Sequence, residues 1–245
     1  MKLINMNNIS QLQNIIDTSD NIVFFGGAGV STESGIPDFR SESGIFKSLE
    51  KYGDVPEKLV SHTYYLKHTE EFYKYYRENL IFKDAKPNPA HLTLSKLEKK
   101  GKLKAIITQN IDGLHQKAGS KNVLELHGSI HRNYCQNCGK EYPLEYILEN
   151  SKIPKCDCGG IIKPDVVLYE EPLDNTTLSL AIEYISNADT LIIGGTSLVV
   201  YPAAGLINYF NGENLVLINK SETPYDDIAS VVINDAIGET LSKID

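Results

Sequence analysis

The sequence predicts an α/β protein built on a doubly wound, mostly parallel β-sheet, with a smaller module attached. Three observations lead to this prediction. Short runs rich in Val and Ile alternate with amphipathic stretches along much of the chain. A glycine-rich turn follows directly on the first of these runs, as it does in Rossmann-like sheets. A turn-rich stretch in the middle of the chain carries all four cysteines and breaks the alternation.

The strands of the sheet are expected where apolar residues run together. These runs are residues 22–25, 103–107, 123–126, 166–169, 191–193 and 215–218. Parallel strands that are buried on both faces have this continuous apolar character. Between the runs, residues 91–100 and 178–186 carry apolar side chains at helical spacing. We expect these stretches to form helices that cover the sheet.

Two insertions are expected to leave the sheet and return to it. Residues 41–89 show no clear strand pattern but carry aromatic side chains at helical spacing, which predicts a helical insertion with a small aromatic core. These aromatic residues are Tyr64, Tyr65, Phe72, Tyr75 and Tyr76. Residues 128–163 are rich in turns around the cysteines, which predicts a zinc-ribbon module. Residues 1–40, 90–127 and 164–245 then form the Rossmann-like domain, and the functional cleft is expected where the insertions meet it.

Composition and charge exclude some functions. The chain has 245 residues, of which 41% are hydrophobic and 23% charged, an ordinary globular composition. Its formal net charge of −8 argues against a nucleic-acid-binding surface, because phosphate binding needs an excess of Lys and Arg. No apolar run approaches the roughly 18 residues that span a membrane, and residues 1–20 are polar. We expect a cytoplasmic protein without a membrane or nucleic-acid partner, and a cationic peptide matches its charge better.

The cysteines form two tight pairs, Cys135-x2-Cys138 and Cys156-x-Cys158. In a reducing compartment such pairs indicate metal ligands before disulfides. Four thiolates suit a tetrahedral structural Zn²⁺ and leave no open position for catalysis. A redox or disulfide role is the alternative. The second pair has the narrower spacing, which puts the geometry or affinity of the zinc site in question.

The turn Gly26-Gly27-Ala28-Gly29 follows directly on the expected strand at residues 22–25. Glycines there let the backbone turn sharply and approach a pyrophosphate, whose charge is favoured at the start of a helix. The turn departs from the usual dinucleotide fingerprint, because Thr32 stands where a third glycine is expected. A tight strand-to-helix turn without a ligand is the alternative.

Polar residues follow two other expected strands. Asn110 and Asp112 come just after residues 103–107, and His127 comes after residues 123–126. Ligands of open α/β sheets bind at the carboxyl ends of the strands. A histidine there can act as a base near neutral pH, because its unperturbed pKa is about 6.5. The other histidines are assigned to surface or packing positions, namely His62, His68, His91, His115 and His131.

Three strings in the chain resemble the sirtuin family of NAD-dependent protein-lysine deacylases, in its bacterial form. Residues 26–40 read GGAGVSTESGIPDFR, residues 108–115 read TQNIDGLH, and residues 126–128 read LHG. The string Gly195-Thr196-Ser197-Leu198, followed by Val200 and Pro202, and residues 218–220 extend the similarity over nearly the whole chain.

The resemblance implies a reaction in which the acyl-lysine carbonyl oxygen attacks the nicotinamide ribose of NAD. Nicotinamide leaves, and a histidine deprotonates a ribose hydroxyl, which attacks the resulting imidate. The products are free lysine and O-acyl-ADP-ribose. The catalytic residues implied here are His127 as the base and Asn110. The residues implied to bind NAD are Ala28, Thr32, Phe39, Arg40, Gln109, Asn110, Ile111, Asp112, His127, Thr196, Ser197, Asn219, Ala236 and Ile237. A structural salt bridge of Asp38 and Arg40 is an equal alternative to direct contact by these two residues.

The resemblance also implies a substrate site and one structural Zn²⁺ held by the four cysteines. Val166, Val167 and Tyr169 are expected to bind the peptide by strand addition. At Tyr169-Glu170-Glu171 the family more often has Phe-Gly-Glu, and Glu170 favours basic peptide residues or is only a solvated charge. No spaced Tyr and Arg pair for an acidic acyl group is present between Lys47 and Arg77. A neutral acyl group is therefore expected. Separately, we expect a monomeric protein.

Other functions remain alternatives. An NAD-dependent ADP-ribosyltransferase or an NAD glycohydrolase shares nicotinamide release, so only the acyl-ADP-ribose product separates them from a deacylase. A nucleotide-binding regulatory module without turnover, which docks a partner through its zinc ribbon, is the alternative from another class. The motif at His127 speaks against this module.

Overall fold

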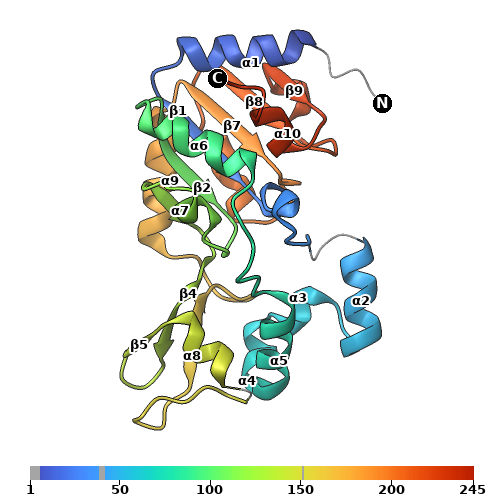
Figure 1. Ribbon diagram of the computed structural model, residues 1–245, viewed down its shortest axis with the longest axis vertical. Helices are drawn as coiled ribbons and strands as arrows, with labels where there is room; N and C mark the ends of the chain where they lie inside the picture. Colours follow the sequence, from blue (N-terminus) through green and yellow to red (C-terminus); the bar gives the residue numbers. More distant parts are fainter. Residues whose placement is uncertain (1–5, 39–41, 151) are drawn as a thin grey trace.

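The computed structural model describes residues 6–38, 42–150 and 152–245. Its larger part is a six-stranded sheet in the order β3-β2-β1-β7-β8-β9, with all neighbouring strands parallel (Figure 1). The strands are β1 (Ile22–Gly26), β2 (Leu103–Thr108), β3 (Val123–Glu125), β7 (Thr190–Gly194), β8 (Asn214–Ile218) and β9 (Val231–Ile233). The strand order reverses at β1, and ligand sites of open α/β sheets lie at such a reversal. The predicted fold class is confirmed.

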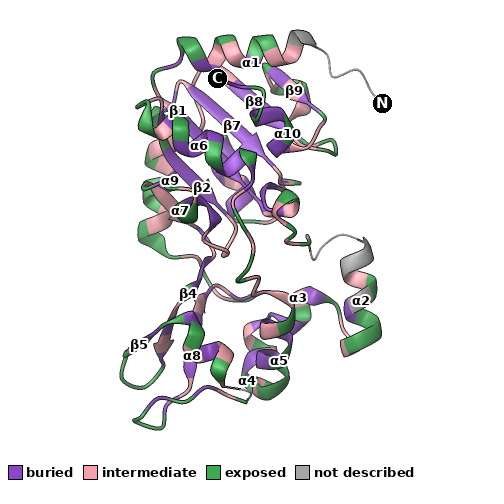
Figure 2. Ribbon diagram, viewed as in Figure 1, coloured by how far each residue is buried: buried purple, intermediate pink, exposed green. Residues whose placement is uncertain are grey.

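One face of this sheet is covered by α1 (Met6–Thr18), α6 (Pro89–Lys99) and α10 (Ile237–Leu241). Because successive side chains of a strand point to opposite faces, Phe24 of β1 packs with Leu12 and Leu94 on this side. All three side chains are fully buried. Along these helices, buried and exposed residues alternate, as expected for helices that cover a sheet on one side (Figure 2).

The opposite face is covered by α9 (Asn175–Asn187) and η3 (Ala203–Tyr209). Here Val23 and Phe25 of β1 pack with Ala181 and Ile185 of α9. The amphipathic stretches at residues 91–100 and 178–186 thus form helices, as their spacing predicts. No helix within the described ranges is long and apolar enough to cross a membrane.

The start of α6 follows from its local sequence. The Asn88 side chain accepts the backbone N–H of Ala90 at 2.9 Å, and the His91 ring accepts the N–H of Asn88 at 3.2 Å. This reciprocal arrangement satisfies backbone donors that have no partner within the helix. Pro89 occupies the first helical position, where its missing N–H costs nothing.

The smaller module is an antiparallel sheet in the order β5-β4-β6, with one short helix beside it. Its elements are β4 (Gly128–Cys135), β5 (Glu141–Tyr142), α8 (Leu144–Glu149) and β6 (Ile162–Val166). The helical insertion lies against it and consists of α2 (Glu42–Tyr52), α3 (Pro56–Leu59), α4 (His62–Lys67) and α5 (Thr69–Asn79). Both share one core, in which Tyr65, Phe72 and Tyr76 pack with Ile130 and Ile162. The aromatic core predicted for residues 41–89 is therefore continuous with the zinc module.

Two strands differ from the expectation. The run at residues 166–169 is not a strand of the parallel sheet: only Val166 lies in a strand, where it pairs with Gly128 in the small antiparallel sheet. Leu168 is nevertheless buried, so the apolar character of the run reflects packing in the small module. The edge strand β9 lies outside the runs from which the sequence predicts strands.

Candidate active site

A pocket of about 240 Å³ lies where the carboxyl ends of the parallel strands meet the smaller module. The predicted site residues that line it are Ala28, Gln109, Asn110, Ile111, Asp112, His127, Val166, Val167 and Tyr169. Four follow β2 directly and one follows β1, so the sheet brings together residues that are far apart in the sequence. A pocket lined by apolar side chains with a few convergent polar groups is typical of a ligand site.

The glycine turn after β1 packs directly against the turn after β7. The N–H of Gly29, in η1 (Ala28–Val30), donates to the carbonyl of Gly195 at 2.8 Å. A Cβ added to Gly29 would lie 2.7 Å from the Cα of Gly195. Gly195 itself has a φ of 59°, in the left-handed region that favours glycine. The two turns thus pack closely at the strand reversal, which is where sheets of this kind hold the pyrophosphate of a dinucleotide such as NAD.

Asp112 lies at the centre of a hydrogen-bond network in the pocket wall. Its Oδ2 accepts the Ser31 hydroxyl at 2.7 Å, and Ser31 Oγ accepts the Asn110 amide at 3.1 Å. Asp112 Oδ1 accepts the N–H of Leu114 at 2.9 Å, at the start of α7 (Leu114–Lys117). The network joins the loop after β1 to the loop after β2, so the side chains of both loops have defined positions.

The ring of His127 is fixed by the backbone. Nδ1 lies 2.9 Å from the carbonyl oxygen of Gln109, which can only accept a hydrogen bond. Nδ1 therefore carries the proton, and the basic lone pair of the neutral ring is on Nε2. The next residue, Gly128, has a φ of 75°, and a Cβ there would lie 1.9 Å from the carbonyl oxygen of Asp165. Only glycine fits this position, which places His127 against β6.

Other predicted NAD contacts lie along the same edge of the sheet, outside the lining of this pocket. Thr196 accepts a hydrogen bond from the Gln109 amide at 3.1 Å, which links the loops after β7 and β2. The remaining residues follow η1, β7, β8 and β9, namely Thr32, Ser197, Asn219, Ala236 and Ile237. Phe39 and Arg40 lie outside the described residues.

The segment after β6 forms another wall of the pocket. The N–H of Val167 donates to the carbonyl of His127 at 3.0 Å, so this segment and the histidine have fixed relative positions. Tyr169 bonds with its N–H to the carbonyl of Val60 at 3.0 Å and with its carbonyl to the N–H of His62 at 2.9 Å. A peptide-binding segment predicted from sequence therefore lies beside the predicted base.

Sequence reasoning missed several pocket residues. Ser31 belongs to the glycine-rich string, but no role was assigned to it. Tyr76 was assigned to the aromatic core, where it is fully buried, and it also lines the pocket together with Leu80 and Phe82. No sequence signal separates these last three from ordinary core residues, because their position in the pocket depends on how α5 packs.

The four cysteines come together at one end of the module. Their Sγ atoms all lie within 4.8 Å of one another, with 3.5 Å between Cys135 and Cys158 and 3.6 Å between Cys138 and Cys156. A tetrahedral zinc with Zn–S bonds of about 2.3 Å places its sulfurs roughly 3.8 Å apart. Disulfide sulfurs lie about 2.05 Å apart. The residues fit a structural Zn²⁺, and the narrow spacing of the second pair does not prevent this arrangement.

Tyr142 supports the metal site from β5. Its hydroxyl donates to the Sγ of Cys156 at 3.0 Å. This hydrogen bond, together with one from the backbone of Cys158, lowers the pKa of the Cys156 thiol to about 6. Because the thiolate is the form that binds a metal, the hydrogen bond favours the ligand state at neutral pH.

The fold and the site define a class of protein: an α/β protein with a glycine turn at the strand reversal, a backbone-oriented histidine in the adjoining pocket and a four-cysteine cluster that fits zinc. The Sir2 family model matches residues 27–202. The chain belongs to the Sir2 family.

Related proteins cover almost the whole chain. An NAD-dependent protein deacetylase of Clostridium acetobutylicum is 62% identical over 241 residues, which are 98% of each chain. A protein of the same description from Clostridium tetani is 61% identical over 241 residues, again 98% of each chain. A solved structure of Sir2 with a deacetylated p53 peptide and 3′-O-acetyl ADP ribose matches with a TM-score of 0.87 and 42% identity, covering 96% of both chains. A Sir2Tm structure with a propionylated peptide has a TM-score of 0.83 and 42% identity, covering 95% of both.

Proposed function

We propose that the chain is an NAD-dependent protein-lysine deacetylase, which transfers the acyl group of lysine to ADP-ribose and releases nicotinamide. The observation that carries this function is the position of His127. Its basic nitrogen is defined by the hydrogen bond to Gln109, and it lies between the Asn110 and Asp112 loop and the peptide segment at Val167. Relatives with the same described activity are more than 60% identical to this chain.

The residues proposed to hold NAD lie along one edge of the sheet. The turn at Ala28 receives the pyrophosphate. Gln109 and Thr196 join the loops after β2 and β7 on either side of it. Asn110, Ile111 and Asp112 line the nicotinamide pocket, where Asp112 accepts a hydrogen bond from the carboxamide. Asn219, Ala236 and Ile237 lie farther along the edge and face the adenine side. Phe39 and Arg40, which lie outside the described residues, are also proposed to contact NAD.

NAD supplies an electrophilic ribose carbon and a nicotinamide leaving group when it is bound. The Nε2 atom of His127 takes a proton from a ribose hydroxyl, and its orientation by Gln109 makes this nitrogen the accepting one. The Asn110 amide donates to Ser31, so its side chain has a fixed orientation beside the reacting carbon. The apolar lining from Ile36, Pro37 and Leu168 excludes water, which would otherwise compete with the acyl group.

The acyl-lysine peptide is proposed to bind along Val166, Val167 and Tyr169. The carbonyl of Val167 has no donor among the described residues, whereas its N–H is bonded to His127. A strand-like peptide can donate to this carbonyl. The inner pocket wall is formed by Val60, Leu80 and Phe82, which favours a neutral acyl group. Solved Sir2 structures at 41–42% identity contain acetylated or propionylated peptides.

Zinc has a structural role in this proposal, because the four cysteines fill a tetrahedral shell. Cysteines that must stay reduced to bind metal suit the cytoplasm, which we propose as the location. We further propose that the protein acts as a monomer. Its partners are then acyl-lysine proteins, and its net charge of −8 makes nucleic acid a poor partner.

Mass spectrometry of a reaction with NAD and an acetyl-lysine peptide tests the function. The expected products are deacetylated peptide, nicotinamide and O-acetyl-ADP-ribose. The His127→Ala variant should lower kcat by on the order of 10² to 10⁴, because it removes the general base. Its thermal midpoint is the control for folding.

Two outcomes would contradict the proposal. Release of nicotinamide without peptide deacetylation would favour an ADP-ribosyltransferase or an NAD glycohydrolase. Unchanged turnover in the His127→Ala variant would mean that this histidine is not the base.

A further inference from the structure

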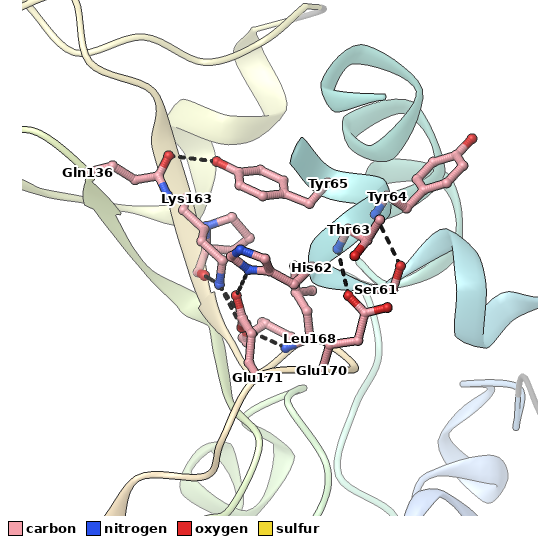
Figure 3. A network of polar contacts seen from close by, with 12 residues as sticks. Ser61, His62, Thr63, Tyr64, Tyr65, Gln136, Lys163, Leu168, Glu170 and Glu171 are labelled. Carbon is pink, nitrogen blue, oxygen red and sulfur yellow. Dashed lines mark hydrogen bonds and ion pairs between the residues drawn. The ribbon is translucent and has the colours of Figure 1, made fainter. Parts of the chain in front are cut away.

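The segment at residues 166–171, which begins at the last residue of β6, is tied to the start of α4 by two adjacent carboxylates (Figure 3). Glu171 points back toward β6 and the His62 ring, whereas Glu170 points toward the backbone of Thr63. All six residues of the segment line the pocket. The contacts of Glu171 set the shape of this wall.

Glu171 makes three polar contacts with its carboxylate. Oε2 accepts the N–H of Leu168 at 2.8 Å and the amine of Lys163 at 3.2 Å, and Oε1 lies 2.8 Å from Nδ1 of His62. Its side chain is 18% exposed. Burial alone raises the pKa of this carboxyl, but the hydrogen bonds from Leu168 and His62 and the charge of Lys163 outweigh it, so the pKa is lowered. The group is therefore a carboxylate at neutral pH.

Lys163 links the two ends of the segment. Its amine donates to the carbonyl of Val166 at 3.0 Å as well as to Glu171. The backbone of Glu171 also donates to the carbonyl of Leu168 at 3.0 Å. The segment is thus closed into a compact turn by one ion pair and one backbone bond.

Backbone bonds and Glu170 attach this turn to α4. Tyr169 pairs with Val60 and His62 through both of its backbone groups. Glu170 has a φ of 76°, which a residue with a side chain rarely adopts, and its carboxylate accepts the N–H of Thr63 at 2.8 Å. The backbone groups of Leu168 and Tyr169 are consequently all bonded within the protein, so the Val167 carbonyl has a fixed direction.

We propose that Glu171 is a positioning residue for the acyl-lysine peptide. It acts through the Leu168 N–H and Lys163, which hold the Val167 edge in the conformation that receives the peptide. This inference rests on the proposed function. Without the carboxylate, the segment has to become ordered when the peptide binds, and this ordering weakens binding. The chemical step, which His127 performs, is not directly altered.

Steady-state kinetics of the Glu171→Gln variant tests this role. We expect the KM for an acetyl-lysine peptide to rise about tenfold, since a charge-assisted contact is lost, while kcat stays within about twofold and the KM for NAD is unchanged. Glu145→Gln, which changes an exposed carboxylate on α8, is the matched control and should leave all three values unchanged.

A double-mutant cycle with Lys163→Met tests whether Glu171 affects the peptide KM through Lys163. If Glu171 acts with Lys163, the double variant should raise the peptide KM no more than the worse single variant. Additive effects would overturn the role of this pair. The Glu171→Asp variant, which keeps the charge on a shorter side chain, should fall between the parent protein and Glu171→Gln.

A merely structural role gives a different pattern. Equal losses in zinc content, NAD affinity and peptide affinity would overturn the proposal, as would an unchanged peptide KM. Fluorescence anisotropy of a labelled acetyl-lysine peptide measures binding without turnover, so a Glu171→Gln variant that does not weaken binding also overturns it. Failure of the parent protein to deacetylate the peptide would instead contradict the proposed function.

Discussion

Asp112 shows how one side chain can organise two loops and still line the ligand pocket. One oxygen accepts the Ser31 hydroxyl, and the other accepts the Leu114 N–H at the start of α7. An ionised carboxylate accepts at both oxygens, whereas an amide has only one acceptor atom. Both acceptor oxygens are therefore needed for its position, in addition to the contact that we propose with NAD.

The Asp112→Asn variant tests this at the residue scale. The amide has one acceptor oxygen in place of two, so either the Ser31 hydroxyl proton or the Leu114 N–H would lose its charged acceptor. Hydrogen bonds to charged groups contribute about 1.5–3 kcal/mol, so the KM for NAD should rise roughly 10- to 100-fold. Nicotinamide release measured against NAD concentration checks this, and an unchanged KM would contradict the role of Asp112. Asn79→Asp, which changes another lining residue, serves as the comparison.

Helices α6 and α7 meet through two buried histidines, His91 and His115, with ring centroids 4.7 Å apart. Burial lowers the pKa of His91 to about 4 despite the opposing charge of Asp112. Burial, and secondarily the neighbouring His91, lowers the pKa of His115 to about 3. Both rings are therefore neutral packing groups at pH 7, in agreement with the structural role expected for them.

The histidine pair makes the stability of the packing between α6 and α7 depend on pH. Unfolded histidines take up protons below about pH 6.5, whereas the folded pair resists protonation until about pH 4. The contribution of the two neutral histidines to stability should be complete above about pH 6.5. It should be lost as the pH falls through about 4. Thermal midpoints measured between pH 7 and pH 4 check this decline. The His115→Leu variant should show a shallower decline, and an equally steep one would mean that other groups cause it.

The whole molecule consists of a large sheet and a smaller module that meet at the pocket. Cys135 and Cys156 belong to the same core as Tyr65 and Tyr73, so the metal site is part of the packing of α4 and α5. The Tyr73 hydroxyl also donates to the carbonyl of Ile162 at 2.5 Å. Loss of zinc should therefore reach the pocket wall through this shared core.

The Cys135→Ala variant tests that coupling. We expect loss of bound zinc, unfolding of the small module at a lower temperature and a fall in peptide affinity, because three thiolates hold the metal weakly. The large sheet has its own core and should melt near the temperature of the parent protein. Zinc analysis and calorimetry measure these effects. A variant that keeps its zinc and its melting curve would contradict this prediction. Ser129→Ala, a buried change in β4 away from the cysteines, controls for loss of a small polar group.

The sequence alone predicts the parallel sheet, the glycine turn and the cysteine cluster. Each depends on local patterns: continuous apolar runs such as residues 22–25, glycines at a strand end, and closely spaced thiols. It also predicts that Asn110, Asp112 and His127 lie together, because parallel strands end at one edge of a sheet. These features follow from residues that are near one another in the chain, or from a general rule of topology.

Only the tertiary structure places Val166 in the small antiparallel sheet and brings Tyr76 into the pocket wall. It also defines the protonated nitrogen of His127 and joins Glu171 to His62, 109 positions earlier in the chain. Hydrophobic periodicity shows that a side chain is buried but not which distant element buries it. Contacts of this kind depend on how separate elements pack, and packing is decided by the whole chain at once.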